Sequence, residues 1–301
     1  ALYPVVVLLA QLAIAVGIGA VGFYGFVFVT DILLRLIEGE RWLLQSYFVP
    51  RVWFGLLVVW PVLVWLVLRW CARKDHLLAW YLMKDYAFSS RLRGAYPPEQ
   101  EVRMAEFADR IAAALTGDAD EVLVVGHSSG AYIAVSVLAD LIRAGRVPEG
   151  TTLSLLTLGH VVPMVSFLPD AHRLRADLAF MAVQDVAWVD VTAPGDGCAF
   201  ALCDPVAVSG VAPEGKRWPL VLSAAFTQTL SDAEQARLKW RLFELHFQYL
   251  NAFDALPEGT DAYDFFRVTA GPLTLGERFA GRAPSKSRIE APVNRFTDLA
   301  A

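Results

Sequence analysis

Apolar and charged residues are unevenly distributed along the 301-residue chain. Residues 1–30 and 52–68 contain no charged side chain, whereas the sequence after residue 70 mixes charged and apolar positions as a globular protein does. A helix needs about 20 apolar residues to cross the ~30 Å hydrocarbon layer of a bilayer. The pattern therefore predicts a transmembrane helical hairpin over residues 1–70, with spans at about 2–29 and 52–70.

The first apolar segment differs from a cleaved signal peptide, because it has no basic start, is too long and lacks a clear small-residue cleavage site. Its recurring glycine and alanine residues would allow close packing against the second span or against a partner protein. Between the spans, charged residues among leucines and aromatics predict a short amphipathic helix in the interface. Lys and Arg residues are slightly more frequent on the C-terminal flank of the hairpin than between the spans, which predicts that both termini and the folded domain lie on the cytoplasmic side. The expected location is an inner or cytoplasmic membrane.

After residue 75, apolar runs alternate with amphipathic stretches. The runs that predict strands buried on both faces of a sheet are 76–86, 121–126, 151–159, 186–194 and 219–226. Helical periodicity is found over 99–115, 130–145 and 231–253. Such alternation is typical of a parallel sheet covered by helices on both faces, so an α/β domain is expected over residues 71–280. Residues 281–301 are polar and contain proline, which predicts a loosely structured tail.

Composition and cysteine content exclude several kinds of function. The net charge is −5, whereas a nucleic-acid-binding protein needs a basic surface. Three cysteines are too few for a disulfide framework, and Cys198 and Cys203 could either pair across a short loop or remain reduced thiols. No CxxC metal spacing is found, and the sequence GHSSG lacks the lysine of a phosphate-binding loop. No metal or cofactor is therefore expected.

The candidate chemistry lies at residues 126–130, where Gly-His-Ser-Ser-Gly separates an apolar run from a helical stretch. A sharp turn between a buried strand and a helix exposes a serine nucleophile, and Ser128 occupies the central position. Gly126 and Gly130 would remove the side chains that collide in such a turn. The N-terminus of the following helix would direct free N–H groups and a positive dipole at an oxyanion. A serine in an unrelated glycine-containing turn is the alternative.

With this motif in its strand–turn–helix context, the sequence resembles the α/β-hydrolase superfamily, in its lipase-like and esterase-like branch, over residues 75–270. The resemblance implies a triad of serine, acid and histidine in that chain order. It also implies two oxyanion donors, namely the N–H of Ser129 and a group in the loop after an earlier strand, near Asp85. The His-Gly pair that is usual in that loop is missing here.

The family order selects the acid and the base. Asp196 lies in a turn just past a predicted strand end, where the family has its acid, and His246 is the histidine that follows it. The preferred triad is therefore Ser128, Asp196 and His246. Asp170 with His172 is the alternative pair, because some lipases carry the acid after the preceding strand. Two residues apart in one loop, they would have difficulty reaching each other and the serine together.

These residues predict a membrane-anchored serine hydrolase in which His246 takes the proton of Ser128, Ser128 attacks an acyl carbonyl, and Asp196 orients the imidazole. A domain tethered at the bilayer meets lipids and amphipathic esters at the highest effective concentration, so lipid-like esters and the bilayer itself are the expected partners. Two other functions fit the same residues. An acyltransferase would use the same serine and histidine but exclude water, and a non-catalytic binding or assembly protein would keep only the fold.

Overall fold

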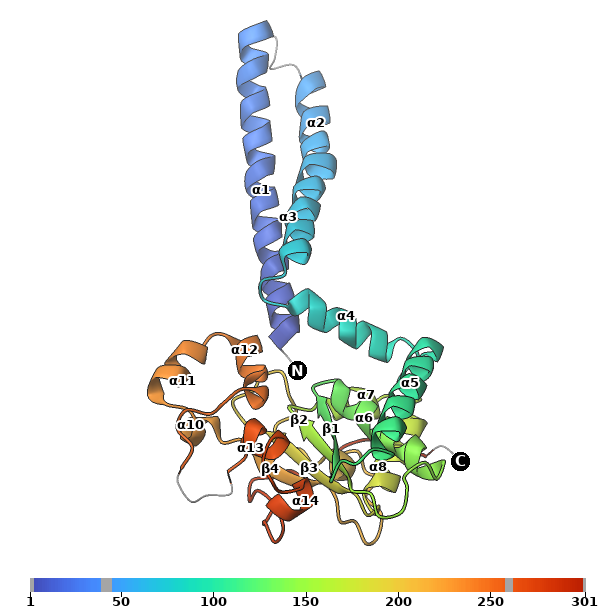
Figure 1. Cartoon of the computed structure of the whole chain (residues 1–301). Coiled ribbons are helices and arrows are strands. Elements are labelled where there is room, and N and C mark those ends of the chain that lie inside the picture. The colour runs from blue at the N-terminus through green and yellow to red at the C-terminus, as the bar shows by residue number, and fades with distance from the viewer. Residues whose placement is uncertain (1–2, 39–44, 258–261, 300–301) are drawn as a thin grey trace. The chain divides into compact units, whose positions relative to one another are not determined.

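The computed structural model describes residues 3–38, 45–257 and 262–299, and the chain divides into two compact units, Leu2–Lys84 and Asp85–Ala301 (Figure 1). The described part of the first unit is helical, and the second unit contains a parallel sheet with helices. The division falls after Lys84, rather than after residue 70 where the second apolar segment ends. The first unit therefore includes more of the chain than the apolar hairpin alone.

Two long apolar helical segments make up most of the first unit. One is α1 (Tyr3–Glu38), and the other is formed by α2 (Gln45–Phe54), the π-helix η2 (Gly55–Val59) and α3 (Trp60–Lys74). The stretches Tyr3–Ile37 and Val49–Lys74 are long and apolar enough to cross a membrane, and only 11% of each apolar window is buried within the protein. The two predicted apolar segments are thus confirmed as helices that could be membrane spans.

Glycines bring these two segments together. An added Cβ at Gly19 would lie 2.2 Å from Cδ1 of Trp60, and one at Gly22 would lie 2.1 Å from Cδ1 of Leu63. The indole N–H of Trp60 also donates to the carbonyl of Val16 at 3.2 Å. The predicted packing of small residues against the second segment is confirmed at these two glycines.

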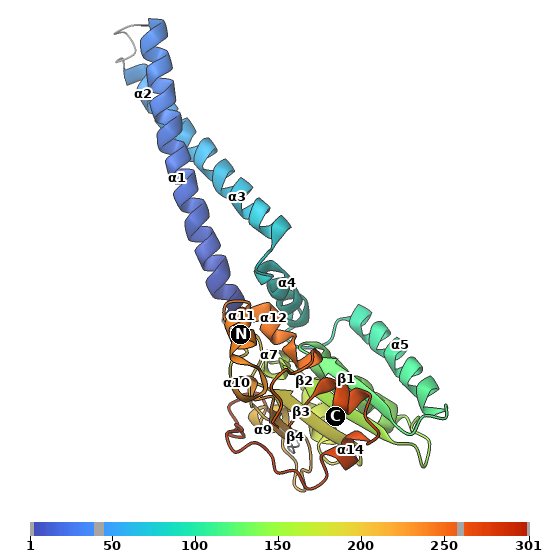
Figure 2. The same ribbon diagram turned by 60° about the vertical axis from the view of Figure 1, so that its left-hand side comes forward.

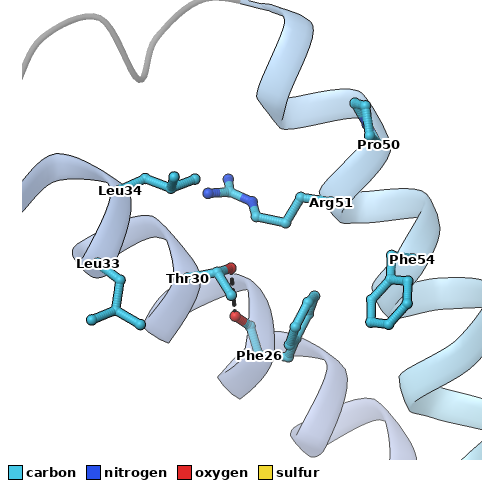
Figure 3. Close-up of a pocket in the computed structure, with 7 residues that line it drawn as sticks. All are labelled: Phe26, Thr30, Leu33, Leu34, Pro50, Arg51 and Phe54. Atoms are coloured by element: carbon cyan, nitrogen blue, oxygen red, sulfur yellow. Dashed lines mark hydrogen bonds between the residues drawn. The ribbon is translucent and has the colours of Figure 1, made fainter. Parts of the chain in front are cut away.

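The short interfacial helix expected between the spans is not found in the described part of residues 30–51. Helix α1 continues to Glu38 and α2 begins at Gln45, while residues 39–44 lie outside the described part. A pocket of about 560 Å³ lies between α1 and α2 here (Figure 3), lined by Phe26, Thr30, Leu33, Leu34, Pro50, Arg51 and Phe54. Arg51 extends from α2 toward α1 and pairs with Asp31 at 3.5 Å.

Helix α4 (Ala79–Ser90) occupies most of the region 76–86 that the apolar pattern assigned to a strand, so this prediction is wrong. Asp75 explains the helix, because its carboxylate accepts hydrogen bonds from the backbone N–H groups of Trp80 at 3.1 Å and Tyr81 at 2.8 Å. Such a bond satisfies N–H groups that have no partner within the first turn of a helix. A short apolar run by itself does not distinguish a buried strand from a helix.

The sheet of the second unit has four parallel strands, which are adjacent in the order β1 (Val122–His127), β2 (Leu153–Leu158), β3 (Ala187–Thr192) and β4 (Leu220–Ser223) (Figure 2). In its register, Gly126 pairs with Thr157, and Thr157 pairs with Asp190. Because parallel strands end at the same edge of a sheet, the segments that follow β1, β2 and β3 lie close together. Four of the five predicted strands and their parallel arrangement are confirmed.

Helices cover both faces of this sheet, as predicted. On one face, Leu155 and Trp188 belong to an apolar core that also includes residues of α5 (Pro98–Leu115), α6 (Gly130–Arg143) and α8 (His172–Met181). On the other face, Leu156, Leu158 and Val191 pack with residues of later, shorter elements. The remaining short helices are α7 (Val162–Ser166), α9 (Pro205–Val208), α10 (Phe226–Thr229), α13 (Phe265–Thr269) and α14 (Leu275–Arg278).

The continuous helix predicted over 231–253 is broken into α11 (Asp232–Leu238), α12 (Leu242–His246) and the 3-10 helix η3 (Gln248–Leu250). Ser231 caps α11, as expected, by accepting the backbone N–H of Glu234 at 3.3 Å. The carboxylate of Asp254 accepts the backbone N–H of Ser231 at 2.8 Å, which joins the two ends of the segment. A straight helix would hold those ends more than about 30 Å apart. The segment must therefore fold back on itself.

The described part of the tail, residues 281–299, contains no helix, and its isolated β-bridge joins Ile289 to Cys203. It is nevertheless bound to the domain. The side chain of Asn294 donates to the carbonyl of Ser166 at 2.9 Å, and buried Arg175 donates from Nε to the carbonyl of Asp298 at 2.8 Å. The expected tail thus lacks regular structure, but hydrogen bonds hold it in place.

Candidate functional site

Ser128 lies between the end of β1 and the start of α6, in strained backbone. Its φ is +57°, in the left-handed region that residues with a side chain rarely adopt. Its N–H donates to the carbonyl of Leu158 at 2.9 Å, so the turn is bonded to the end of β2. An added Cβ at Gly126 would lie 2.7 Å from the carbonyl oxygen of Gly130, whereas one at Gly130 would meet nothing within 4 Å. The steric reason expected for both glycines therefore holds only for Gly126.

Asp196 and His246 form a buried pair at the same edge of the sheet. Asp196 follows β3 in a turn closed by its N–H bond to the carbonyl of Ala193 at 3.0 Å, and His246 is the last residue of α12. Nδ1 of His246 lies 2.7 Å from Oδ2 of Asp196, and both residues are at most 3% exposed. The bond requires Nδ1 to carry the proton, which leaves a lone pair on Nε2 of a neutral ring. Nε2 is buried and has no hydrogen-bond partner among the described residues.

Further hydrogen bonds fix the orientation of the Asp196 carboxylate. Oδ2 also accepts the hydroxyl of Tyr249 at 3.0 Å, and Oδ1 accepts the N–H of Cys198 at 2.8 Å. The Tyr249 hydroxyl in turn accepts the N–H of Ala193 at 2.9 Å. Tyr249 is fully buried, and burial, followed by the negative charge of Asp196, raises the pKa of its hydroxyl well above the usual value. Tyr249 therefore stays a neutral donor to the carboxylate.

His127 and Gly159 contact His246 and so place the end of α12 beside the turn at Ser128. Nε2 of His127 donates to the carbonyl of His246 at 2.9 Å, and the two rings lie 4.6 Å apart. An added Cβ at Gly159, which directly follows β2, would lie 3.1 Å from Cε1 of His246. Ser128 and His246 are thus brought to the same end of β1 and β2, although no hydrogen bond joins their side chains in the described part of the chain.

The electrostatics of this region keep His127 neutral. Burial is the main cause that lowers the pKa of His127, to about 4, and the neighbouring His246 lowers it further. A neutral ring can donate from Nε2 to the His246 carbonyl without placing a positive charge beside that histidine. This role for His127 was not anticipated from the sequence, where it was only a position of the pentapeptide.

Of the two residues expected to stabilise an oxyanion, only Ser129 lies where the expectation placed it. Ser129 is the residue before α6, and its N–H makes no backbone hydrogen bond within the described residues, as expected for a free donor at a helix start. Asp85 does not lie in a loop after a strand but inside α4, where backbone N–H groups bond within the helix. The basis for a backbone donor at Asp85 is therefore removed. Burial raises the pKa of the Asp85 carboxyl above its usual value, and the neighbouring Ser129 side chain partly offsets that rise.

Among the described residues, Asp170 and His172, the alternative pair, form no hydrogen bond or ion pair with each other or with Ser128. Asp170 forms an ion pair with Arg93 at 2.9 Å, and His172 at the start of α8 accepts a hydrogen bond from buried Arg175 at 3.1 Å. His172 also contacts Asp298 of the tail. Each member thus has another partner, while the Asp196–His246 pair is formed.

A group of three possible metal ligands was missed by the sequence analysis. The ligand atoms of Asp196, Cys198 and His246 lie within 4.8 Å of one another, and all three residues are buried. All three cysteines of the chain are free, so the alternative of a Cys198–Cys203 disulfide is not realised. The signal in the sequence is only an Asp-x-Cys turn, because the histidine is 50 residues away.

Comparisons of the chain with protein-family models, with curated proteins and with solved structures found no match.

Proposed function

We propose that this protein is a membrane-anchored serine hydrolase of the α/β-hydrolase type, which cleaves acyl esters and favours lipid-like substrates. Ser128 is the nucleophile, His246 the general base and Asp196 the acid that orients the base. The observation that carries the proposal is the buried hydrogen bond between His246 and Asp196, next to a strand–helix turn that holds Ser128 in the left-handed region. Strain of this kind is most often retained where function needs it.

The tautomer of His246 supports its role as the base. A base for serine must offer a lone pair on one ring nitrogen. Donation from Nδ1 to Asp196 leaves that lone pair on Nε2, which no other described residue uses. Hydrogen bonds between a nucleophile and its base are often long or misaligned without substrate, so we expect the bond from Ser128 to form in the complex.

The reaction then follows from these positions. His246 accepts the Ser128 proton while the serine oxygen forms a bond to the acyl carbon, and the carbonyl oxygen becomes an oxyanion. The free N–H of Ser129 and the positive end of α6 stabilise that oxyanion. When the ester bond breaks, His246 gives its proton to the leaving alcohol. Water repeats the sequence on the acyl-enzyme and releases the acid.

The lipid preference rests on a different observation, namely the two apolar helices of the first unit that are long enough to cross a membrane. A catalytic unit joined directly to such helices would act at the bilayer surface, where the local concentration of acyl lipids is highest. An acyltransferase would share the first half of the reaction. The products formed with and without an added alcohol distinguish transfer from hydrolysis.

The test is covalent labelling of the full-length protein, solubilised in detergent, with a fluorophosphonate probe that reacts with activated serines. We expect labelling of the wild type, loss in Ser128→Ala and a reduction of at least a hundredfold in His246→Ala. The matched controls are Ser129→Ala, which retains the backbone N–H, and His172→Ala, and both should be labelled. No labelling of the folded wild type would contradict the proposal and favour a non-catalytic binding protein. Loss in His172→Ala but not in His246→Ala would reassign the base.

A further inference from the structure

We propose that Asp196, Cys198 and His246 bind a thiophilic divalent cation, with Zn²⁺ as the reference ion, and that the bound cation switches off the base. The proposed binding of the cation is inferred only from the geometry of these three side chains. The inhibition rests on the proposed function, because it concerns the same histidine.

The three donors are already close enough to form a metal site. Their ligand atoms lie within 4.8 Å of one another, and Nδ1 of His246 and Oδ2 of Asp196 are only 2.7 Å apart. Ligands of a tetrahedral zinc ion stand roughly 3–4 Å from one another, given metal–ligand distances of about 2.0–2.3 Å. The His246–Asp196 pair would therefore open slightly to admit the ion between the three donors.

The types of donor favour zinc-like ions over hard cations. A thiolate and an imidazole are preferred by Zn²⁺ and its neighbours, whereas Mg²⁺ and Ca²⁺ prefer oxygen atoms only. Three protein ligands leave a fourth position for water or an anion. The carboxylate is also oriented from outside, because Tyr249 and the N–H of Cys198 donate to it. Such outer hydrogen bonds are typical of metal sites.

Charge balance permits this site in a buried position. Asp196 is 3% exposed, Cys198 is 7% exposed and His246 is 1% exposed, so an uncompensated ion would be costly here. One carboxylate and one thiolate neutralise a divalent cation, while the imidazole binds as a neutral ligand. Binding therefore releases the thiol proton of Cys198, and no other proton leaves the site.

The imidazole proton explains the inhibition. Coordination at Nδ1 requires the proton now on that nitrogen to move to Nε2, because a neutral ring carries one proton. Nε2 then becomes an N–H donor and can no longer accept the proton of Ser128. The cation thus inactivates the base without contacting the serine.

The binding is tested with Co²⁺, whose thiolate bonds give a near-ultraviolet charge-transfer absorption. Full-length protein in detergent is titrated as wild type, Cys198→Ala and Cys203→Ala, the last being the matched control from the same loop. We expect the absorption to saturate at one equivalent of Co²⁺ in the wild type and in Cys203→Ala. In Cys198→Ala we expect no such absorption and an affinity for Co²⁺ that is at least tenfold weaker. Absence of the absorption in the wild type, or an unchanged absorption in Cys198→Ala, would overturn the site.

The inhibition is tested by fluorophosphonate labelling with and without one equivalent of Zn²⁺. We expect the labelling rate of the wild type and of Cys203→Ala to fall at least tenfold with Zn²⁺. The ratio of rates with and without Zn²⁺ should be close to one in Cys198→Ala, whatever its own rate. Equal inhibition in all three proteins would refute the proposed switch. If the wild type is not labelled at all, the proposed hydrolase fails, but the Co²⁺ titration still decides whether the metal site exists.

Discussion

Nδ1 of His246 donates to Oδ2 of Asp196 at 2.7 Å, although 50 residues separate them in the sequence. The bond joins the turn after β3 to the end of α12, and it determines which ring nitrogen carries the proton. The arrangement depends on the short helix α12 ending at His246, since a continuous helix through this region would not fold back to the sheet edge.

Loss of the Tyr249 hydroxyl should weaken both the fold and the Asp196–His246 pair. Tyr249→Phe removes the donor to Asp196 and leaves the Ala193 N–H without its acceptor. An unsatisfied buried donor costs about 1–3 kcal/mol, so we expect a lower melting temperature and a roughly tenfold slower fluorophosphonate labelling. The control is Tyr263→Phe, which removes a hydroxyl bonded to the Tyr249 carbonyl at 2.8 Å. If both variants lose labelling equally, the bond to Asp196 has no special role.

A side chain at Gly159 should displace His246. Gly159 has φ +52°, and an added Cβ would lie 2.7 Å from Cε2 of Tyr249 and 3.1 Å from Cε1 of His246. We expect Gly159→Ala to fold with reduced thermal stability and to be labelled at least tenfold more slowly, because Tyr249 and His246 must shift from their positions beside Asp196. Gly195→Ala, where a Cβ meets nothing within 4 Å, is the control. Normal labelling of Gly159→Ala would show that the position of His246 tolerates the change.

The depressed pKa of His127 predicts a loss of stability in acid. The folded-state pKa is about 4, below the usual 6.5, so the unfolded chain binds more protons between these values. The penalty begins as the pH falls through about 6.5 and is complete near pH 4, where it amounts to about 3 kcal/mol. In His127→Gln, which has no titrating ring, the melting temperature should fall less between pH 7 and pH 4.5 than in the wild type. Parallel pH profiles for the two proteins would contradict the assignment.

Packing of the two apolar helices should depend on one glycine and not on its neighbour. A Cβ at Gly22 would lie 2.1 Å from Leu63, whereas a Cβ at Gly25 meets nothing within 4 Å. We expect Gly22→Leu to reduce the yield of folded, detergent-solubilised protein and its melting temperature, because the helices must separate. Gly25→Leu adds the same apolar volume without that contact and should behave as the wild type. Equal behaviour of the two variants would mean that the helices do not pack closely at Gly22 and Leu63.

The candidate site was only partly accessible to sequence reasoning. The Gly-x-Ser-x-Gly pattern located the strand–helix turn, since a buried apolar run and an amphipathic helix on either side are local features. The chain order implied by the resemblance to the α/β-hydrolases selected Asp196 and His246, and the structure brings these two together. It missed Tyr249, His127, Gly159 and Cys198, because their contacts depend on how the segments after β2, β3 and α12 converge.

The sequence by itself determined the division into an apolar helical part and an α/β part, four strands of the sheet and the position of Ser128 between a strand and a helix. These features follow from local periodicity and from the length of apolar runs, which neighbouring residues decide. The helix over residues 79–90, which the short apolar run did not distinguish from a strand, follows from the local Asp75 cap. Tertiary structure decided that the segment 231–253 folds back, through the Ser231–Asp254 bond. It also decided the buried partners of Asp196, because hydrogen bonds between distant segments exist only once the sheet has aligned its strand ends.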